Sequence, residues 1–114
     1  MIIVEVYYRA KPGMREKILE LAKPNVEGSR KEKGNLSYTH YPSPENDQDV
    51  FVFEKWESFA DLDAHGKTEH HRTFSAARAP LLESNSFKIT IWDSELNEAQ
   101  TKSSQEFANR AINY

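Results

Sequence analysis

The chain contains no cysteine and only 4 glycines in 114 residues. Without cysteine there can be no disulfide, thiol nucleophile or thiolate metal site, and a reducing compartment fits, so we expect a cytoplasmic protein. Apolar runs are short, and none approaches the roughly 20 residues that a membrane-spanning helix requires. The apolar N-terminal run meets a charge at Glu5, too early for a signal peptide. We therefore expect no membrane partner.

Neither sign of charge dominates the chain. Its 15 basic and 18 acidic residues give a formal net charge of -3, and the two signs are interspersed. A protein that binds nucleic acid usually presents a basic stripe, so we expect no nucleic-acid partner. The sequence also lacks a phosphate-binding loop, a dinucleotide-binding glycine motif and a serine nucleophile elbow. Its length allows one hydrophobic core.

Hydrophobic periodicity predicts the order strand, helix, strand, strand, helix, strand. Alternating or continuous apolar residues predict strands over residues 2–9, 36–41, 50–56 and 87–92. Helical spacing begins at Met14, with Pro24 inside the helix and Gly34 as its expected end. A second helical region begins at a capping box of Ser58 and Asp61, is interrupted at Gly66 and ends near Pro80. This order is typical of a ferredoxin-like α+β sandwich, with both helical layers on one face of an antiparallel sheet.

The third predicted strand is apolar on both faces, because Val50 and Val52 alternate with Phe51 and Phe53. One helical layer covers only one face of a sheet, so the other face would expose an apolar patch. We therefore predict a homodimer in which two sheets pack face to face, with an uncovered monomer as the alternative.

The chain divides into a domain over residues 1–94 and a polar tail over residues 95–114. The tail is either mobile or forms a short helix that packs on the partner subunit, because Phe107, Ala111 and Ile112 could share one face.

An ordered set of motifs supports a family assignment. A strand ends in Glu54, one spacer and Trp56, and His65, His70 and Phe74 follow at fixed spacing. Upstream, Pro12-Gly13 precedes the first helix, and Glu32-Lys33-Gly34-Asn35 precedes Tyr38. Over about residues 1–94 this pattern resembles the antibiotic biosynthesis monooxygenase family, of the dimeric α+β barrel superfamily. The resemblance implies a dimeric barrel and, as in quinol and anthrone monooxygenases, oxidation by molecular oxygen without a metal or organic cofactor.

Other branches of the same superfamily give alternatives. Haem-degrading members carry an asparagine on the first strand, a tryptophan on the following helix and a histidine beyond it. Residues 2–9 contain no asparagine, and the other two positions correspond to His65 and Ser75, so haem degradation is disfavoured. An isomerase that processes a small signalling metabolite, or a binding protein, stays open, as does a module that only dimerises.

A cofactor-independent oxygenase needs a base, an apolar pocket and polar groups that hold an anion. His65 and His70 are the candidate bases, because the ordinary histidine pKa near ~6.5 allows proton transfer at neutral pH. The sequence does not choose between them. Each also has a purely structural explanation. His65 could be a histidine that stabilises a helix C-terminus, and His70 could be a buried histidine satisfied by a hydrogen bond. His71 lies about 100° further round the helix and is expected to face solvent.

Six further side chains are candidates for substrate binding, namely Trp56, Phe74, Tyr8, Tyr38, Phe53 and Arg72. For each of them, ordinary core packing or surface solvation is the competing explanation. His40, Tyr7, Phe51 and Asn25 are weaker candidates. A metal site among Asp63, His65, Glu69, His70 and His71 is not expected, because Gly66 should interrupt the helix and the family resemblance implies no metal.

Overall fold

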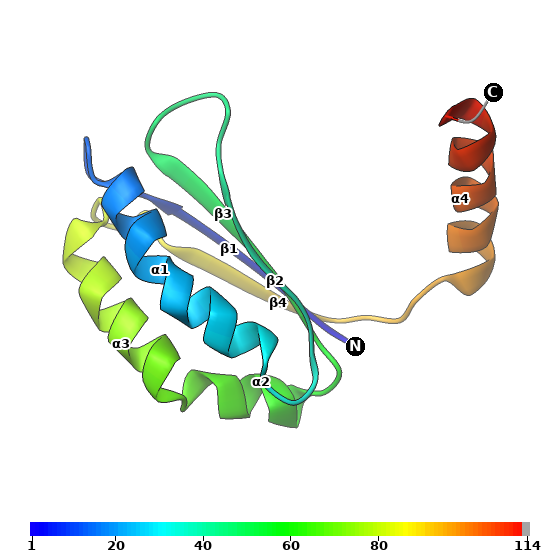
Figure 1. Ribbon diagram of the computed structural model, residues 1–114, viewed down its shortest axis with the longest axis horizontal. Helices are drawn as coiled ribbons and strands as arrows, with labels where there is room; N and C mark the ends of the chain where they lie inside the picture. The colour runs from blue at the N-terminus through cyan, green and yellow to red at the C-terminus, as the bar shows by residue number, and fades with distance from the viewer. Residues whose placement is uncertain (113–114) are drawn as a thin grey trace.

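The structure is a computed structural model that describes residues 1–112, and it contains a four-stranded antiparallel sheet with helices on one face (Figure 1). The strands are β1 (Ile2–Arg9), β2 (Asn35–Pro42), β3 (Asp49–Trp56) and β4 (Lys88–Asp93), in the order β2-β3-β1-β4. Helices α1 (Arg15–Arg30), α2 (Phe59–Gly66) and α3 (Glu69–Arg78) connect them, and α4 (Glu98–Ile112) follows β4. The predicted ferredoxin-like α+β fold is confirmed.

The helix boundaries follow from local chemistry. The Ser58 hydroxyl accepts a hydrogen bond from the Asp61 backbone N–H at 3.2 Å and so caps α2, which ends at Gly66 as predicted. After α3, Pro80 lies in the 3₁₀ turn η1 (Ala79–Leu81). Helix α1 runs through Pro24 and ends at Arg30, before the predicted stop. Gly34 has φ +80° and forms the turn into β2 instead, a conformation that glycine adopts without steric cost.

The core lies between α1, α3 and the helical side of the sheet. Alternate side chains of the paired strands point to this side, so each strand contributes every second residue. The buried apolar residues are Ile2, Val4, Val6, Tyr8, Ala10, Ile18, Ala22, Tyr38, Val50, Val52, Trp56 and Phe74.

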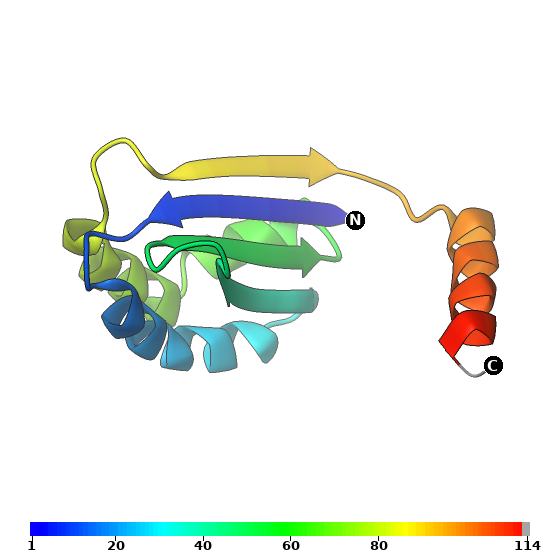
Figure 2. The ribbon, with the colours of Figure 1, turned by 90° about the horizontal axis from the view of Figure 1, so that it is seen from above.

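The opposite face of the sheet carries no helix from the described part of the chain (Figure 2). Tyr7 and Trp92 lie on this open face and are 51% and 53% exposed. Phe51 stacks against Tyr7 with ring centroids 4.8 Å apart. The ring centroid of Phe53 lies 6.1 Å from that of Phe51. The predicted apolar patch is therefore present.

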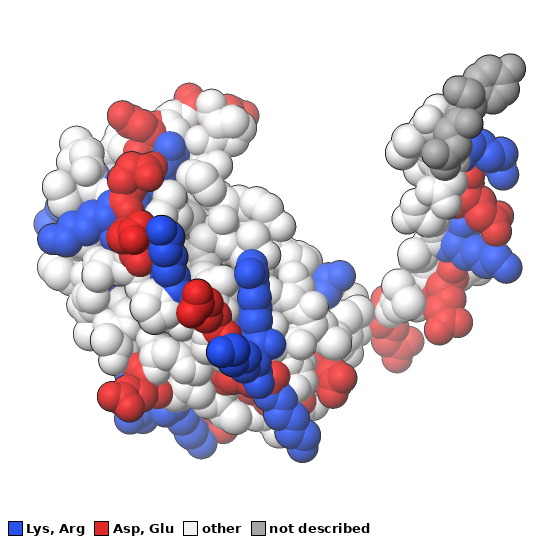
Figure 3. Space-filling model, viewed as in Figure 1, with Lys and Arg blue, Asp and Glu red and all other residues white. Residues whose placement is uncertain are grey.

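Helix α4 stands away from the rest of the molecule, at the end of the extended segment that follows β4 (Figures 1 and 2). As a result the radius of gyration is 16.3 Å, whereas a compact chain of this length would have about 13 Å. Charged side chains of both signs are mixed over the helical side of the molecule (Figure 3). No helix within residues 1–112 is long and apolar enough to cross a membrane.

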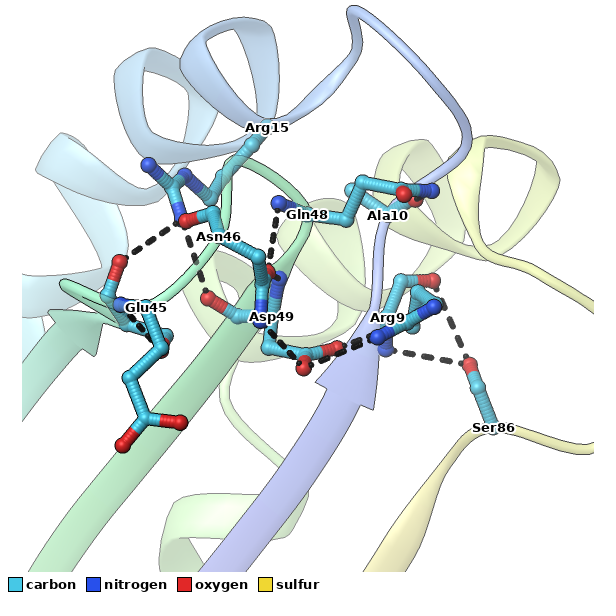
Figure 4. A network of polar contacts seen from close by, with 9 residues as sticks. Arg9, Ala10, Arg15, Glu45, Asn46, Gln48, Asp49 and Ser86 are labelled. Carbon is cyan, nitrogen blue, oxygen red and sulfur yellow. Dashed lines mark hydrogen bonds and ion pairs between the residues drawn. The ribbon is translucent and has the colours of Figure 1, made fainter.

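A polar network fixes the β2–β3 connection to the end of β1 (Figure 4). Arg9 donates two hydrogen bonds to the Asp49 carboxylate, at 2.9 and 3.1 Å, and Asn46 donates to the same carboxylate at 2.8 Å. Arg15, from the start of α1, donates to the Asn46 carbonyl at 2.7 Å. The charges of Arg9, Arg15 and Asp49 therefore serve to hold this loop in place.

Candidate active site

Two histidines and one glutamate meet where the turn after α1 contacts α2 and α3. One carboxylate oxygen of Glu32, Oε2, lies 2.7 Å from His65 Nδ1 and 3.0 Å from His70 Nε2. A neutral histidine that donates one ring N–H keeps a lone pair on its other nitrogen. The free nitrogens are then His65 Nε2 and His70 Nδ1, and the shared carboxylate orients both rings.

The two free nitrogens differ in their surroundings. His65 is only 2% exposed, and its Nε2 is buried without a hydrogen-bond partner in the described structure. The His70 ring packs against Gly28, where an added Cβ would lie 2.7 Å from His70 Nδ1. His65 therefore presents a free nitrogen to the interior, while the His70 side chain lies against α1, is 25% exposed and lines a surface groove.

Trp56 and Glu54 form one side of the His65 environment. The Trp56 ring centroid lies 4.7 Å from that of His65, and the indole N–H donates to Glu54 Oε1 at 3.0 Å. This N–H is thus used inside the protein. The same Glu54 oxygen lies 4.0 Å from His65 Nε2. Burial raises the pKa of the Glu54 carboxyl, because the charged form is poorly solvated there.

His71 does not face solvent, so that prediction is wrong. Its ring lies 4.5 Å from the His65 ring, and its Nδ1 is buried without a partner in the described part of the chain. Burial lowers the pKa of His71 to about 4, and the neighbouring His65 acts in the same direction. At the start of α3, His71 packs against His65 of α2 while His70 contacts Glu32, so two successive residues point inward.

Tyr38 and His40 extend the polar group along β2. Asn25 is buried in α1 and donates to the Tyr38 hydroxyl at 2.8 Å, so it is not a solvated helix residue. Both ring nitrogens of His40 are buried and lack partners among the described residues. Burial, followed by the charges of Arg78 and Arg30, lowers the pKa of His40 to about 4. His40 is therefore neutral at pH 7, with one donor and one acceptor nitrogen unused.

Arg78, at the end of α3, is a buried cation that sequence reasoning missed. It is 9% exposed, and its guanidinium carbon lies 4.8 Å from the ring centroid of Phe74 and 5.1 Å from that of Tyr8. A third ring, Phe87, lies 5.0 Å away. One signal was available, because Arg78 follows Phe74 by four residues and His70 by eight, on the same helical stripe.

The structure gathers most of the predicted site residues on the helical side of the sheet. His65, His70, Trp56 and Tyr38 lie in the cluster around Glu32 and Glu54, and Phe74 and Tyr8 lie around Arg78. Two predicted residues do not join them. Phe53 pairs with Glu5 on the open face, and Arg72 is exposed on α3.

Glu32, His65 and His70 also form a group that could hold a metal ion, because their ligand atoms lie within 4.8 Å of one another. Two imidazoles and one carboxylate are a donor set that Zn²⁺ and other transition metals accept. The acidic residues that the sequence offered for such a site, Asp63 and Glu69, do not belong to this group as the structure describes it.

A groove of about 610 Å³ between α1 and α3 borders this group, and His70 is the member of the group that lines it. It is lined by Glu20, Leu21, Pro24, Asn25, Glu69, His70, Thr73, Phe74 and Ala77. His70 connects the groove to the Glu32 group, and Phe74 connects it to Arg78. A flat, mainly apolar ligand could therefore approach both polar groups from one opening.

Comparison with known proteins places this arrangement in a family. Residues 1–77 match the pattern described as "Antibiotic biosynthesis monooxygenase". The chain is 32% identical over 98 residues to "Putative monooxygenase YcnE" of Bacillus subtilis, a match that covers 86% of this chain and all of that protein. It is also 31% identical over 100 residues to the uncharacterized protein sll1783 of Synechocystis, covering 88% of this chain and 66% of that protein.

Solved structures agree in fold. A structure described as a putative antibiotic biosynthesis monooxygenase from Nitrosomonas europaea superposes with a TM-score of 0.79 at 24% identity, covering 84% of this chain and all of that one. PA3566 from Pseudomonas aeruginosa superposes with a TM-score of 0.74 at 26% identity, covering 83% and 94%. The matched pattern spans more than half of the chain, and Glu54, Trp56, His65 and His70, on which the resemblance in sequence rests, lie together in the structure. The chain belongs to the antibiotic biosynthesis monooxygenase family.

Proposed function

We propose that this protein is a cofactor-independent monooxygenase that oxidises a hydroquinone-like or polycyclic phenolic substrate with molecular oxygen. One observation carries the proposal: the buried His65 is held through Nδ1 by Glu32, while its Nε2 is unpaired beside Trp56. A base whose ring is oriented by a carboxylate is the usual arrangement for proton abstraction. Family membership supports monooxygenase-like chemistry in general.

His65 acts as the base in this proposal. Its Nε2 takes a proton from the substrate, and the Glu32 carboxylate, 2.7 Å from Nδ1, stabilises the imidazolium that forms. His70 contacts the same oxygen from the other side at 3.0 Å and keeps the carboxylate in place. Trp56 and Phe74 supply flat apolar surfaces for the ring system of the substrate.

The oxidation then needs only the substrate anion and oxygen. For an anthrone-type substrate, the carbanion gives one electron to O₂, and the two radicals combine to a peroxide that takes up the abstracted proton. Loss of water from the peroxide converts CH₂ to C=O. One oxygen atom enters the carbonyl group and the other leaves in water, so O₂ accepts all four electrons that the substrate loses.

The same proposal includes a homodimer through the open face of the sheet. The accessible surface is 7840 Å², whereas a folded monomer of this mass would have about 6,400 Å². An interface of standard size covers about 800 Å² on each partner, and the excess here comes from the open face of the sheet together with the detached α4. The exposed aromatic side chains of the open face are the natural surface to cover.

Oxygen consumption by the metal-free protein tests the activity. Reduced quinones and anthrones are supplied, and uptake is compared with autoxidation in buffer and with the His65→Gln, His70→Gln and Glu32→Gln variants. Glu57→Gln is the matched control, because it removes a carboxylate from an exposed residue outside the cluster. Uptake that depends on His65 and Glu32 is the expected result. No uptake above autoxidation, or equal rates in wild type and His65→Gln, would refute the assignment.

A second function is favoured by the same pair of histidines. Two imidazoles on one carboxylate can remove a proton at one carbon and return it at another, which is what a non-oxidative isomerase of a small metabolite requires. That function predicts histidine-dependent exchange of substrate protons with deuterated water without oxygen consumption.

A further inference from the structure

The guanidinium group of Arg78 is the one charged group of α3 that is largely buried, and the carboxylate that acts on it electrostatically, Glu54, does not contact it within the described residues. Within residues 1–112, no carboxylate oxygen forms an ion pair with it at 4.0 Å or less, and no hydrogen bond from it is present. Burying a cation without a partner is costly, and native proteins keep such a group mainly where something binds it. Burial accordingly lowers the pKa of Arg78, although an arginine stays charged.

Unsatisfied polar atoms lie around this cation. The Tyr8 hydroxyl is buried and interacts electrostatically with the Arg78 guanidinium without a hydrogen bond of good geometry, and the Tyr8 ring lies against the guanidinium at 5.1 Å. His40 contacts Phe74, with ring centroids 5.6 Å apart, and Phe74 lies 4.8 Å from the guanidinium carbon. Both ring nitrogens of His40 are also without a partner. A buried polar atom that nothing in the protein satisfies needs a ligand or ordered water.

We propose that Arg78, with the Tyr8 hydroxyl and an N–H of His40, forms a binding site for an anionic oxygen on an aromatic ligand. The guanidinium supplies charge-assisted hydrogen bonds, and the two neutral donors complete the set. The rings of Tyr8, Phe74 and Phe87 hold the cation and give the ligand an apolar wall. This inference rests on the proposed function, because it takes the ligand to be the substrate that also meets His65.

The groove between α1 and α3 borders both groups through one lining residue each, although neither Arg78 nor His65 lines it. Phe74 lines this groove and contacts the guanidinium, while His70 lines it and contacts Glu32. A planar substrate that enters there would place one end near the histidines and another near Arg78. The substrate is therefore expected to be acidic at the end away from the base.

The anionic oxygen could come from two sources. It is either a carboxylate that the substrate already carries or an ionised phenol that forms when the substrate loses its proton. Both offer a negative oxygen on an aromatic ring, and a pair of matched probes distinguishes them. The probes are 1-hydroxy-2-naphthoate and its neutral amide, 1-hydroxy-2-naphthamide.

Binding of both probes to the full chain is measured by titration calorimetry in the absence of oxygen. If the site takes a carboxylate, wild type binds the acid at least about tenfold more tightly than the amide, and Arg78→Gln removes this preference. If it takes an ionised phenol, wild type lowers the phenol pKa of the bound amide by about one unit or more, seen by absorbance, and Arg78→Gln abolishes the shift.

Two controls keep the outcome decisive. Lys17→Gln removes one positive charge from the exposed face of α1 and should leave both readouts unchanged. Arg78→Lys keeps the charge and should retain part of the preference. Arg78→Gln loses the contacts of the guanidinium with three rings, so its thermal unfolding midpoint is measured to confirm that the variant is folded under the binding conditions. If Arg78→Gln is folded and binds both probes within twofold of wild type with an unchanged phenol pKa, the proposal is wrong. It is equally wrong if neither probe binds wild type at millimolar concentration.

The result is separate from the test of oxygenation. Binding is measured without oxygen and without turnover, so an anion preference that depends on Arg78 would survive a failure to consume oxygen. In the opposite case, histidine-dependent oxygen uptake with no effect of Arg78 would leave the monooxygenase in place and remove the anion site.

Discussion

One carboxylate oxygen of Glu32 contacts two imidazole rings, and the position of each ring depends on the residues packed around it. His65 is fixed between Trp56 and His71, with ring centroids 4.7 and 4.5 Å away. His70 instead reaches Glu32 across the surface of α1, and it can do so because residue 28 is glycine. The second histidine is therefore the one that a small change in packing should displace.

Gly28→Ala tests this dependence. The new Cβ would lie 2.7 Å from His70 Nδ1, so the ring must swing away and lose its contact with Glu32. Alanine is more favourable than glycine inside a helix by up to about 1 kcal/mol, so stability should not fall. We expect oxygen uptake to decrease by about tenfold, consistent with the loss of a supporting contact in a proton-transfer site.

The matched control is Gly66→Ala in α2, where an added Cβ meets nothing within 4 Å. Its activity should equal that of wild type. Stability is measured by urea unfolding of both variants, and the His70 ring is followed by NMR. An unchanged His70 spectrum and unchanged turnover in Gly28→Ala would contradict the role given to this contact.

His40 should make the protein less stable in acid. In the folded protein the pKa of His40 is lowered to about 4 by burial and by the charges of Arg78 and Arg30. In the unfolded chain its pKa has the ordinary value near ~6.5. Between these values the unfolded state binds a proton that the folded state does not, so the free energy of unfolding falls as the pH is lowered from about 6.5 to about 4. The contribution of His40 is at most about 3 kcal/mol and is constant below that window.

Urea unfolding at pH 7 and pH 4.5 measures this effect. His71 has a lowered pKa of the same direction, so the comparison is between wild type and His40→Gln. The variant should lose less stability than wild type over this range. Identical losses in the two proteins would show that His40 does not titrate as described.

Individual side chains were predicted only in part. His70 and Phe74 share a stripe of spacing four, and this alone placed both on the inner side of α3. The prediction that His71 faces solvent was wrong because helical spacing gives the direction of a side chain but not the shape of the surrounding interior. Arg78 was missed because an arginine inside an apolar stripe is usually a surface residue, and the absence of a carboxylate in contact with it is a fact of three-dimensional packing.

At the scale of elements, the strands and helices follow local signals closely. The alternation of β1 and β3, the Ser58 cap, Gly66 and Pro80 all act within a few residues, so their effects can be read directly from sequence. The gathering of Glu32, His65 and His70 could not be read in this way. Their proximity depends on how the turn after α1 meets α2 and α3, which involves residues more than thirty positions apart.

Helix α4 forms where the sequence left a tail that is mobile or packed on a partner. Its apolar side chains have no covering surface in the described chain, since Phe107 is 68% exposed and Ile112 is 78% exposed. On the hypothesis that α4 packs on the partner subunit, Phe107→Glu should weaken the dimer by about tenfold or more, because burial of such a ring contributes about 1.5–3 kcal/mol. The unfolding of the monomeric body should not change.

Sedimentation equilibrium measures the dimer dissociation constant of this variant. Gln105→Glu is the control, because Gln105 lies on another face of α4 and is also exposed. Equal dissociation constants for Phe107→Glu, Gln105→Glu and wild type would place α4 outside any interface.

At the scale of the whole molecule, the candidate site lies on one side of the sheet, and the other side exposes the apolar surface proposed for dimerisation. Tyr7 lies on the open side of β1, 51% exposed and stacked on Phe51. Replacing it with glutamate would place a charge at the centre of a sheet-to-sheet interface, where desolvation strongly opposes burial. We therefore expect Tyr7→Glu to be a folded monomer at concentrations at which wild type is a dimer.

Light scattering coupled to gel filtration gives the mass of each variant, and Ala76→Glu adds the same charge to the exposed side of α3 as a control. The two interface variants together separate the possible assemblies. If the sheets meet and α4 wraps the partner, both Tyr7→Glu and Phe107→Glu weaken the dimer. If only the sheets meet, Tyr7→Glu acts alone. A dimer that survives Tyr7→Glu would have to form through another surface, and the apolar open face would then need a different explanation.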